Sequence, residues 1–358
     1  MTDRFSSARE GLSRRRFLKA VGAGGLSLSG IPLLGRARSG SGEPGASEPR
    51  TAGAVLFGAF SEPVAPETGY IDSLSAFEDA AQRTVGVYRA YRNWGQPLIT
   101  PPIEHLLART PRPRLYLSVH AFYGSKAQNV IPWAEIANGL HDPQIDAWSA
   151  ELLRLTAVTP VYLCFHHEME NEEGKCGSPV DFQEAYWHVR RRVEVRNRVA
   201  NLTWVVTYMG STFRGMHGGP DRWWPGIPRL GLPADHLVGA DVYNRYLCHD
   251  KEWRSFDWLA AEPFAFAQRV GRPLFIGECG CVEGDACGGT LRHGVKKGHW
   301  FLGALGYMRD TAPALGFGPL EAFCYSNVLA AGGSSYRIDS SLRSTSYFRT
   351  LATDPFFA

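Results

Sequence analysis

Short apolar runs rich in β-branched residues recur along the chain from residue 51 onward, and stretches long enough for a helix separate them. Successive runs start about 30 to 45 residues apart, the usual length of a β-strand, a helix and the return to the next strand. Eight such units in roughly 300 residues predict a single (β/α)8 TIM barrel of the α/β class. The predicted strands are 55–60, 85–91, 114–120, 161–168, 202–208, 237–243, 274–278 and 321–326.

The main alternative is an open doubly wound sheet, but no Gly-x-Gly-x-x-Gly follows the first run, so this fold lacks its usual support. Between the strands, amphipathic segments predict helices at 143–156, 179–199 and 263–270. The first two begin at Asp-Pro and Ser-Pro, which are typical helix starts. We see no internal repeat and no appended binding module, so we expect one catalytic domain over residues 52–358, acting as a monomer.

The first fifty residues have a different character from the rest. Arg14-Arg15-Arg16-Phe17-Leu18-Lys19 precedes an uncharged stretch of fourteen residues, 21–34. A basic segment followed by a short, weakly apolar one is typical of an export signal, and paired arginines before Phe-Leu-Lys indicate the twin-arginine route. Because a transmembrane helix needs about twenty apolar residues, we expect no stable membrane insertion. Residues 1–38 are therefore predicted to be a twin-arginine signal peptide, 39–51 a flexible spacer, and the protein secreted or in the cell envelope.

The formal charge of +3 belongs entirely to that leader. The first fifty residues hold nine basic and four acidic side chains, so the remaining 308 hold 29 basic and 31 acidic ones, a net charge of −2. A nearly neutral body without basic blocks argues against a nucleic-acid partner, which requires a dense basic face.

Seven cysteines leave at least one thiol unpaired if the others form disulfides. Cys279-Gly-Cys281, with Cys287 and His293 nearby, superficially suggests a metal site, but the spacing matches no common zinc pattern. Outside the cytoplasm disulfides are permitted, so the sequence favours disulfides in the loops over a metal site.

Chemistry in a (β/α)8 barrel gathers at the carboxyl ends of the strands, and two predicted strands end in glutamate. Glu168 ends the fourth, and Glu278 ends the seventh. Burial next to apolar strands raises the pKa of a carboxyl group unless hydrogen bonds or cations stabilise its charge. Two carboxyl groups in different environments can form the acid and the nucleophile that cleave a glycosidic bond. A single glutamate could instead be a structural ion-pair partner, but the pair at strands four and seven favours catalysis.

At this point the chain resembles glycoside hydrolase family 26, the β-mannanase family of retaining glycosidases. The resemblance spans about residues 52 to 350 and is strongest between 161 and 280. Its motifs, in chain order, are His167-Glu168-Met169, Ala185-Tyr186-Trp187-His188-Val189-Arg190 with Ala200-Asn201-Leu202-Thr203-Trp204-Val205, Gly239-Ala240-Asp241-Val242-Tyr243-Asn244, and Arg272-Pro273-Leu274-Phe275-Ile276-Gly277-Glu278.

The resemblance implies a role for each matching residue. Glu168 would be the general acid/base and Glu278 the nucleophile. His167 would position the acid/base or a sugar hydroxyl, and Tyr243 would donate a hydrogen bond to Glu278. In a retaining enzyme the two carboxyl groups lie about 5 to 5.5 Å apart. Such a reaction needs no cofactor, and none is expected here; the expected partner is a β-linked polysaccharide.

The substrate that the resemblance implies first is β-1,4-mannan, cleaved internally by an exported enzyme. The family usually continues after His-Glu-Met with Asn-Gly and tryptophans that bind sugar, whereas this chain has Glu170-Asn171-Glu172-Glu173-Gly174-Lys175-Cys176. Mixed-linkage β-glucan and β-1,3-xylan, which other family members cleave, therefore stay open. A non-catalytic carbohydrate-binding protein on the same barrel is the alternative of a different class.

The chain is also rich in aromatic rings, with 10 Trp, 14 Tyr and 19 Phe. Rings near strand ends can stack on sugars, although most rings in any protein belong to the core. The candidates for substrate binding are Trp94, His120, Tyr208, Trp224 and Tyr325, the last at the place on strand eight where the family often has Trp. For His120, a buried structural histidine is the competing interpretation, and a loop tryptophan can equally stabilise its own loop.

Overall fold

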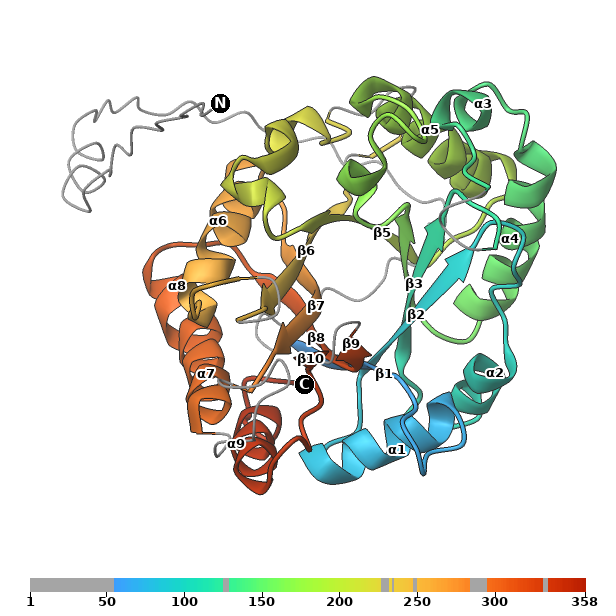
Figure 1. Cartoon of the computed structure of the whole chain (residues 1–358). Helices are drawn as coiled ribbons and strands as arrows, with labels where there is room; N and C mark the ends of the chain where they lie inside the picture. The colour runs from blue at the N-terminus through green and yellow to red at the C-terminus, as the bar shows by residue number, and fades with distance from the viewer. Residues whose placement is uncertain are drawn as a thin grey trace, which may run out of the picture. The chain divides into compact units, whose positions relative to one another are not determined.

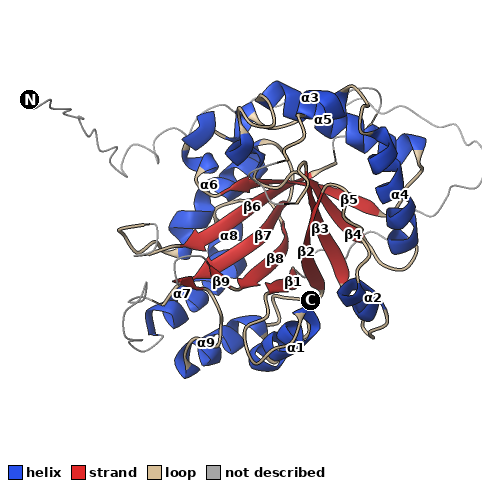
Figure 2. Ribbon diagram, turned by 45° about the vertical axis from the view of Figure 1, so that its right-hand side comes forward, coloured by secondary structure: helices blue, strands red, loops and turns tan. Residues whose placement is uncertain are grey.

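Eight parallel strands close into a barrel in which each strand pairs with the next along the chain, and β8 pairs with β1. The computed structural model describes residues 55–124, 129–226, 232–233, 235–246, 250–283, 295–330 and 334–358. Figure 1 shows the helices in a ring outside the strands, and Figure 2 shows the strands from a second direction. The predicted (β/α)8 barrel is confirmed, while the predicted leader and spacer lie outside the described residues.

The strands lie close to their predicted positions. Their bounds are β1 Leu56–Ser61, β2 Val87–Asn93, β3 Arg114–His120, β4 Val161–Phe165, β5 Leu202–Met209, β6 Leu237–Asn244, β7 Leu274–Cys281 and β8 Leu320–Asn327. After β8, a small antiparallel pair forms from β9 Leu329–Ala330 and β10 Ser334–Ser335. The helices are α1 Tyr70–Ala81, α2 Pro101–Leu107, α3 Trp133–Ala137, α4 Asp142–Thr156, α5 Pro179–Arg191, α6 Phe256–Arg269, α7 Val295–Gly306, α8 Ala312–Ala314 and α9 Leu342–Ala352.

Two of the three helix predictions hold well at their starts, where α4 and α5 each have a proline in the first turn. In α5, the Ser178 side chain accepts from the Asp181 backbone and the Asp181 carboxylate accepts from the Ser178 backbone, which forms a capping box. The third prediction is wrong at its start: α6 begins at Phe256, and Pro263 lies inside the helix. Proline is typical of a helix start, but here the buried face of α6 extends on both sides of it and favours one continuous helix.

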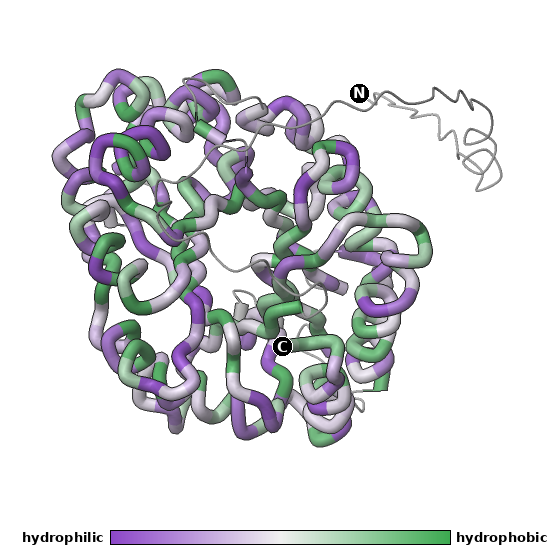
Figure 3. Tube along the Cα trace, turned by 180° about the vertical axis from the view of Figure 1, so that it is seen from behind, coloured by the Kyte–Doolittle hydropathy of each residue, from purple (hydrophilic) through white to green (hydrophobic). Residues whose placement is uncertain are grey.

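Side chains alternate between two environments along each strand, as the pleat of a β-strand requires. One set fills the inside of the barrel and includes Val87, Tyr116, Tyr162, Cys164, Val205, Leu237, Phe275, Ala322 and Cys324. The other set packs against the helices in a larger apolar core. The outer helices alternate between polar and apolar positions along their length, as Figure 3 shows in purple and green, because each helix buries one face only.

A β-bulge interrupts this alternation in β7. Ile276 pairs with Ala240 of β6, but the next partner of Asp241 is Glu278, so Gly277 is the extra residue. A Cβ atom on Gly277 would lie 3.0 Å from the Tyr116 ring inside the barrel, so Gly277 faces the interior. With the extra residue in place, Glu278 also reaches the interior side instead of the helical layer. Bulges are common beside active sites because they re-aim a side chain in this way.

The expectation of loop disulfides is wrong for most of the cysteines that the structure describes. Four of them are buried free thiols outside any disulfide: Cys164, Cys279, Cys281 and Cys324; Cys176 is also buried. Cys279 and Cys281 belong to β7 rather than to a loop, so their thiols pack as small apolar groups. The remaining two, Cys248 and Cys287, lie outside the described residues. Over the described part of the chain, no helix combines the length and the apolar character needed to cross a bilayer.

Candidate active site

The two glutamates lie on different kinds of backbone: Glu168 on the turn after β4 and Glu278 within strand β7. Glu168 lies three residues beyond the end of β4, not on the strand as predicted, and has left-handed backbone angles of φ 50° and ψ 48°. This conformation is uncommon outside glycine and tends to occur at functional sites. It begins the 3-10 turn Met169–Glu172, from which the Asn171 amide donates to Glu168 Oε2 at 3.0 Å. Glu278 instead lies within β7, three residues before the strand ends.

Both carboxylate oxygens of Glu278 accept hydrogen bonds from tyrosine. The Tyr243 hydroxyl donates to Oε2 at 2.8 Å, and the Tyr91 hydroxyl donates to Oε1. An Arg89 guanidinium nitrogen lies 3.4 Å from Oε1, and His167 Nε2 lies 3.1 Å from the same oxygen. The Glu278 side chain is 12 % exposed. The carboxylate is therefore oriented from both sides and still open to a ligand.

The cation beside Glu278 is itself buried and packed between rings. Arg89 is fully buried, with its guanidinium carbon 3.7 Å from the centre of the Tyr116 ring and 4.3 Å from that of Tyr91. Its Nη1 donates to Ser118 Oγ at 2.6 Å. Burial by itself would lower the pKa of Arg89, but the oxygens of Tyr116, Tyr91 and Glu278 raise it well above its ordinary value. Arg89 is thus a fixed positive charge on the floor of the site.

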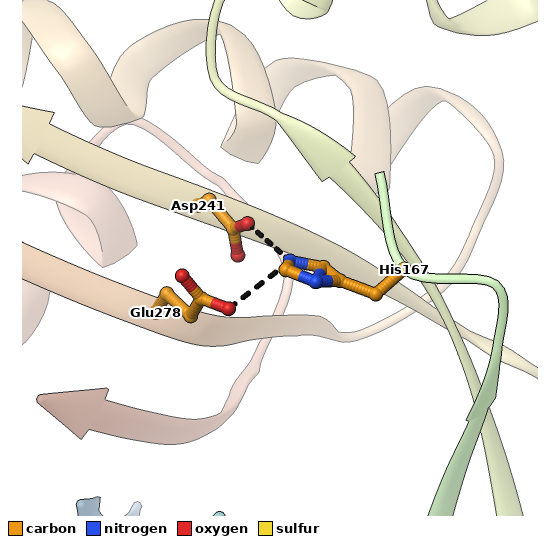
Figure 4. A group of neighbouring side chains, drawn as sticks. All are labelled: His167, Asp241 and Glu278. Atoms are coloured by element: carbon orange, nitrogen blue, oxygen red, sulfur yellow. Dashed lines mark hydrogen bonds and ion pairs between the residues drawn. The ribbon is translucent and has the colours of Figure 1, made fainter. Parts of the chain in front are cut away.

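A second buried carboxyl group, Asp241, lies between the two glutamates. His167 Nε2 is 2.5 Å from Asp241 Oδ2 and 3.1 Å from Glu278 Oε1, as Figure 4 shows. Burial raises the pKa of Asp241 well above its usual range, and the charges of Glu278 and Glu168 raise it further, as does a side-chain hydrogen bond to Glu168. Like charges so close together cannot all ionise, so Asp241 favours its neutral form and connects Glu168 to His167 and Glu278.

The same three side chains, His167, Asp241 and Glu278, each offer one possible metal-ligand atom, all within 4.8 Å of one another. His167 is already within hydrogen-bond distance of both carboxyl groups. His167 Nε2 therefore has a carboxyl group on each side.

Glu278 opens into a cleft of about 460 Å³ at the mouth of the barrel. The cleft is lined by Phe60, Glu62, Tyr91, His120, His167, Tyr243, Glu278, Ser326, Val328 and Leu329. The His120 ring lies 5.8 Å from the His167 ring and stacks on Phe122 at 5.0 Å. Of the five predicted substrate-binding residues, His120 is thus the one that the structure places in this cleft.

The structure does not place Trp94, Tyr208 and Tyr325 in the cleft, because these side chains are at most 1 % exposed. Tyr208 neighbours the interior-facing Thr207 and therefore faces the helices, where it packs against Phe266 of α6. Tyr325 likewise faces outward, and its hydroxyl donates to the backbone oxygen of Tyr336 at 2.6 Å. Trp94 packs against Trp148 of α4, with ring centres 4.3 Å apart. The physical reason is the alternation along each strand, which turns these rings away from the barrel mouth.

Trp224 is half-buried, and its ring lies 4.5 Å from the ring of His236. His236 directly precedes β6, whereas Asp241, which pairs with Glu278, lies five residues further along that strand. At about 3.3 Å per residue, this separation is roughly 16 Å. Trp224 thus lies away from the carboxylates, and its contact with substrate stays a prediction.

Three residues of the site were missed by the sequence interpretation: Arg89, Tyr91 and Asp241. A signal was available for each of them. An arginine within an apolar strand requires a partner, and Arg89 with Tyr91 on β2 follows the two-residue spacing of one strand face. Asp241 and Tyr243 on β6 follow the same spacing.

By sequence alone, no family model and no curated protein matches the chain. Its fold, however, matches many solved structures. The catalytic domain of a family 26 endo-β-1,4-mannanase from Bacillus sp. JAMB-750 aligns with a TM-score of 0.57 and 13 % identity, over 85 % of this chain and 87 % of that one. A β-mannanase from a symbiotic protist of the termite Reticulitermes speratus gives 0.55 and 13 %, over 85 % and 88 %.

A family 26 endo-β-1,4-mannanase from Cellulomonas fimi gives a TM-score of 0.55 and 16 % identity, over 85 % of this chain and 72 % of that one. At such low identity, these similarities concern the fold. The resemblance to family 26 β-mannanases that the motifs predict is therefore confirmed in the three-dimensional fold.

Proposed function

We propose that this protein is an exported, retaining endo-β-glycosidase, with β-1,4-mannan as the first candidate substrate. The proposal rests on one observation above all. The carboxylate of Glu278 is held by two tyrosine hydroxyls beside the buried Arg89, at the base of an open cleft. A carboxylate fixed in this way is suited to attack a sugar carbon, because its orientation is set before the substrate binds.

In the proposed mechanism, Glu278 attacks the anomeric carbon while Glu168 gives its proton to the departing glycosidic oxygen. A covalent glycosyl-enzyme forms on Glu278 and the reducing-end fragment leaves. Glu168, now ionised, takes a proton from water, and the resulting hydroxide displaces Glu278 from the sugar. The neutral Asp241 would stabilise Glu168 in its ionised state by hydrogen bonding. Tyr91 and Tyr243 would again donate hydrogen bonds to the Glu278 carboxylate once it has left the sugar.

Mannan is the first candidate because the similar solved structures are described as endo-β-1,4-mannanases. The turn after Glu168 supports a wider panel of substrates. Its side chains Met169, Glu170 and Glu172 are buried, and none of them is an aromatic ring that could stack on a sugar. Lichenan and β-1,3-xylan therefore belong beside mannan in the test.

The decisive experiment compares the purified protein with Glu278→Ala and Glu168→Ala on soluble β-mannan, lichenan, β-1,3-xylan and β-glucan. We expect reducing ends to appear with the wild type on at least one polysaccharide and to be lost in both variants. A 2-fluoro glycoside of the hydrolysed sugar should label Glu278, as measured by mass spectrometry of the digested protein. If wild type and Glu278→Ala release equal amounts on all four substrates, the protein is not a glycosidase of this mechanism.

The export proposal has its own test. Residues 1–50 fused to a folded reporter should carry it out of the cytoplasm, and replacing Arg15 and Arg16 with lysine should stop this export. The matched control replaces Arg36 and Arg38, which lie beyond the uncharged stretch. Export that survives the Arg15/Arg16 change would exclude the twin-arginine route.

A further inference from the structure

A second hollow lies beside the catalytic cleft, on the other side of Tyr243. It has a volume of about 120 Å³ and is lined by Met209, Gly210, Ser211, Arg214, Asp241, Tyr243, Arg245, Asp250 and Leu259. Tyr243 lines both spaces and donates to Glu278. The hollow and the catalytic cleft therefore share Tyr243 as a common wall.

Two arginines face this hollow from neighbouring strands. Arg214 ends the 3-10 turn Thr212–Arg214 that follows β5, and Arg245 directly follows β6. Among the residues that the structure describes, neither guanidinium forms an ion pair with a carboxylate. Arg254, which lies nearby in the chain, pairs with Glu252 at 2.7 Å. Guanidinium groups that line a hollow can donate hydrogen bonds to an anionic ligand.

Both guanidinium groups are held by aromatic rings rather than by acids. Arg214 lies over the exposed ring of Trp258, 4.5 Å from its centre, and Arg245 lies over Tyr243 at 5.1 Å. Contact with a ring face positions a guanidinium group but leaves its in-plane N–H donors unused. Gly210 lets the chain after β5 approach β6 closely, because a Cβ atom there would lie 2.5 Å from the backbone oxygen of Asp241.

The two spaces differ in the charged side chains that line them. The hollow carries Arg214 and Arg245 together with the carboxyl groups of Asp241 and Asp250. Further out, Glu262 also influences Arg214. The catalytic cleft carries Glu62 and Glu278. A negatively charged substituent on a sugar would therefore meet two guanidinium groups in the hollow.

We propose that the Arg214–Arg245 hollow binds a carboxylate of the polysaccharide, so that the natural substrate is an acidic β-linked glycan that contains uronic acid residues. This inference rests on the proposed glycosidase function and names its substrate class. The planar guanidinium group matches the two oxygens of a carboxylate. The volume of the hollow, well above the roughly 10–15 Å³ of a single buried water, suits a substituent rather than a chain of sugars.

The test measures binding separately from hydrolysis. In the Glu278→Gln variant, which removes the nucleophile, calorimetry compares neutral β-1,4-mannan and β-1,4-glucan oligosaccharides with the same oligosaccharides oxidised to carboxylates at C6. We expect the oxidised form of at least one backbone to bind about tenfold tighter or more, the usual gain of a hydrogen bond to a charged group.

In the same background, Arg214→Gln should remove this preference and Arg214→Lys should retain part of it. Arg343→Gln, which removes one exposed positive charge from α9, should leave the preference unchanged. Equal binding of neutral and oxidised oligosaccharides on both backbones would overturn the inference, as would a preference that survives Arg214→Gln.

Hydrolysis by the wild type distinguishes this failure from failure of the proposed function. Hydrolysis of a neutral polysaccharide together with equal binding of both forms would leave the glycosidase proposal standing and reject the acidic substrate. Tight binding of oxidised oligosaccharides that depends on Arg214, with no hydrolysis of either form, would support the hollow and reject the glycosidase.

Discussion

Removing one hydroxyl group tests whether the tyrosine contacts orient the nucleophile. Tyr243→Phe deletes the donor that lies 2.8 Å from Glu278 Oε2 and keeps the ring, which packs 5.0 Å from the Tyr336 ring. A hydrogen bond to a charged group contributes about 1.5–3 kcal/mol. If the whole contribution serves to orient the nucleophile in the transition state, kcat/KM should fall about 10- to 150-fold. The loss should appear mainly in kcat, because the ring that lines the cleft remains.

The assay is steady-state hydrolysis of the substrate found in the polysaccharide panel, with thermal unfolding measured on the same samples. Tyr307→Phe is the matched control, since that hydroxyl is buried, lies far from the cleft and has no hydrogen-bond partner in the described part of the chain. We expect it to leave both activity and stability unchanged. A Tyr243→Phe enzyme with wild-type kcat would refute the idea that this hydroxyl orients Glu278, and a rise in KM alone would assign it to substrate binding.

Three further predictions follow from buried positions. A Cβ atom on Gly280 would lie 2.6 Å from the Tyr243 ring, so Gly280→Ala should displace that ring. In the same assay, it should lower kcat/KM at least as much as Tyr243→Phe does, and unchanged kinetics would contradict this. Burial raises the pKa of Glu170 from about 4.5 to about 8, so the folded state binds this proton more tightly than the unfolded state does. The free energy of unfolding should therefore fall by about 4–5 kcal/mol in total as the pH rises from about 4.5 to about 8. Urea unfolding of Glu170→Gln across this range should lack that contribution, and identical slopes in the two proteins would show that Glu170 does not cause it. Finally, Trp94→Ala should lower the free energy of unfolding by about 3–5 kcal/mol without changing kcat/KM per folded molecule, whereas a specific loss of activity would return Trp94 to the list of substrate contacts.

The sequence by itself determined the barrel and the main catalytic candidates. Apolar runs at regular spacing can satisfy their backbone hydrogen bonds and bury their side chains only as successive strand–helix units, so the period was sufficient to predict the fold. Glu168 and Glu278 stood out because burying a carboxyl group next to an apolar strand is unfavourable unless other groups stabilise it. His167 and Tyr243 followed from the motifs in which they occur.

The tertiary structure decided which side chains share a space. Tyr208 and Tyr325 stand at the predicted strand ends, yet a shift of one residue along a strand turns a side chain from the barrel interior to the helices. In β7, by contrast, a side chain that strict alternation would turn toward the helices faces the interior, because the bulge at Gly277 brings Glu278 there. Neither direction can be assigned from composition, because the face of a residue depends on register and bulges.

The partners of Glu278 depended on closure of the barrel. Arg89 and Tyr91 lie 189 and 187 residues from it along the chain, and no local pattern links them. Only a closed barrel places β2 and β7 around one interior, where a buried cation and a buried carboxylate stabilise each other. The sequence thus determined which elements form and which groups are chemically capable, while tertiary packing determined that Arg89, Tyr91 and Asp241 complete the site and that most of the predicted rings do not.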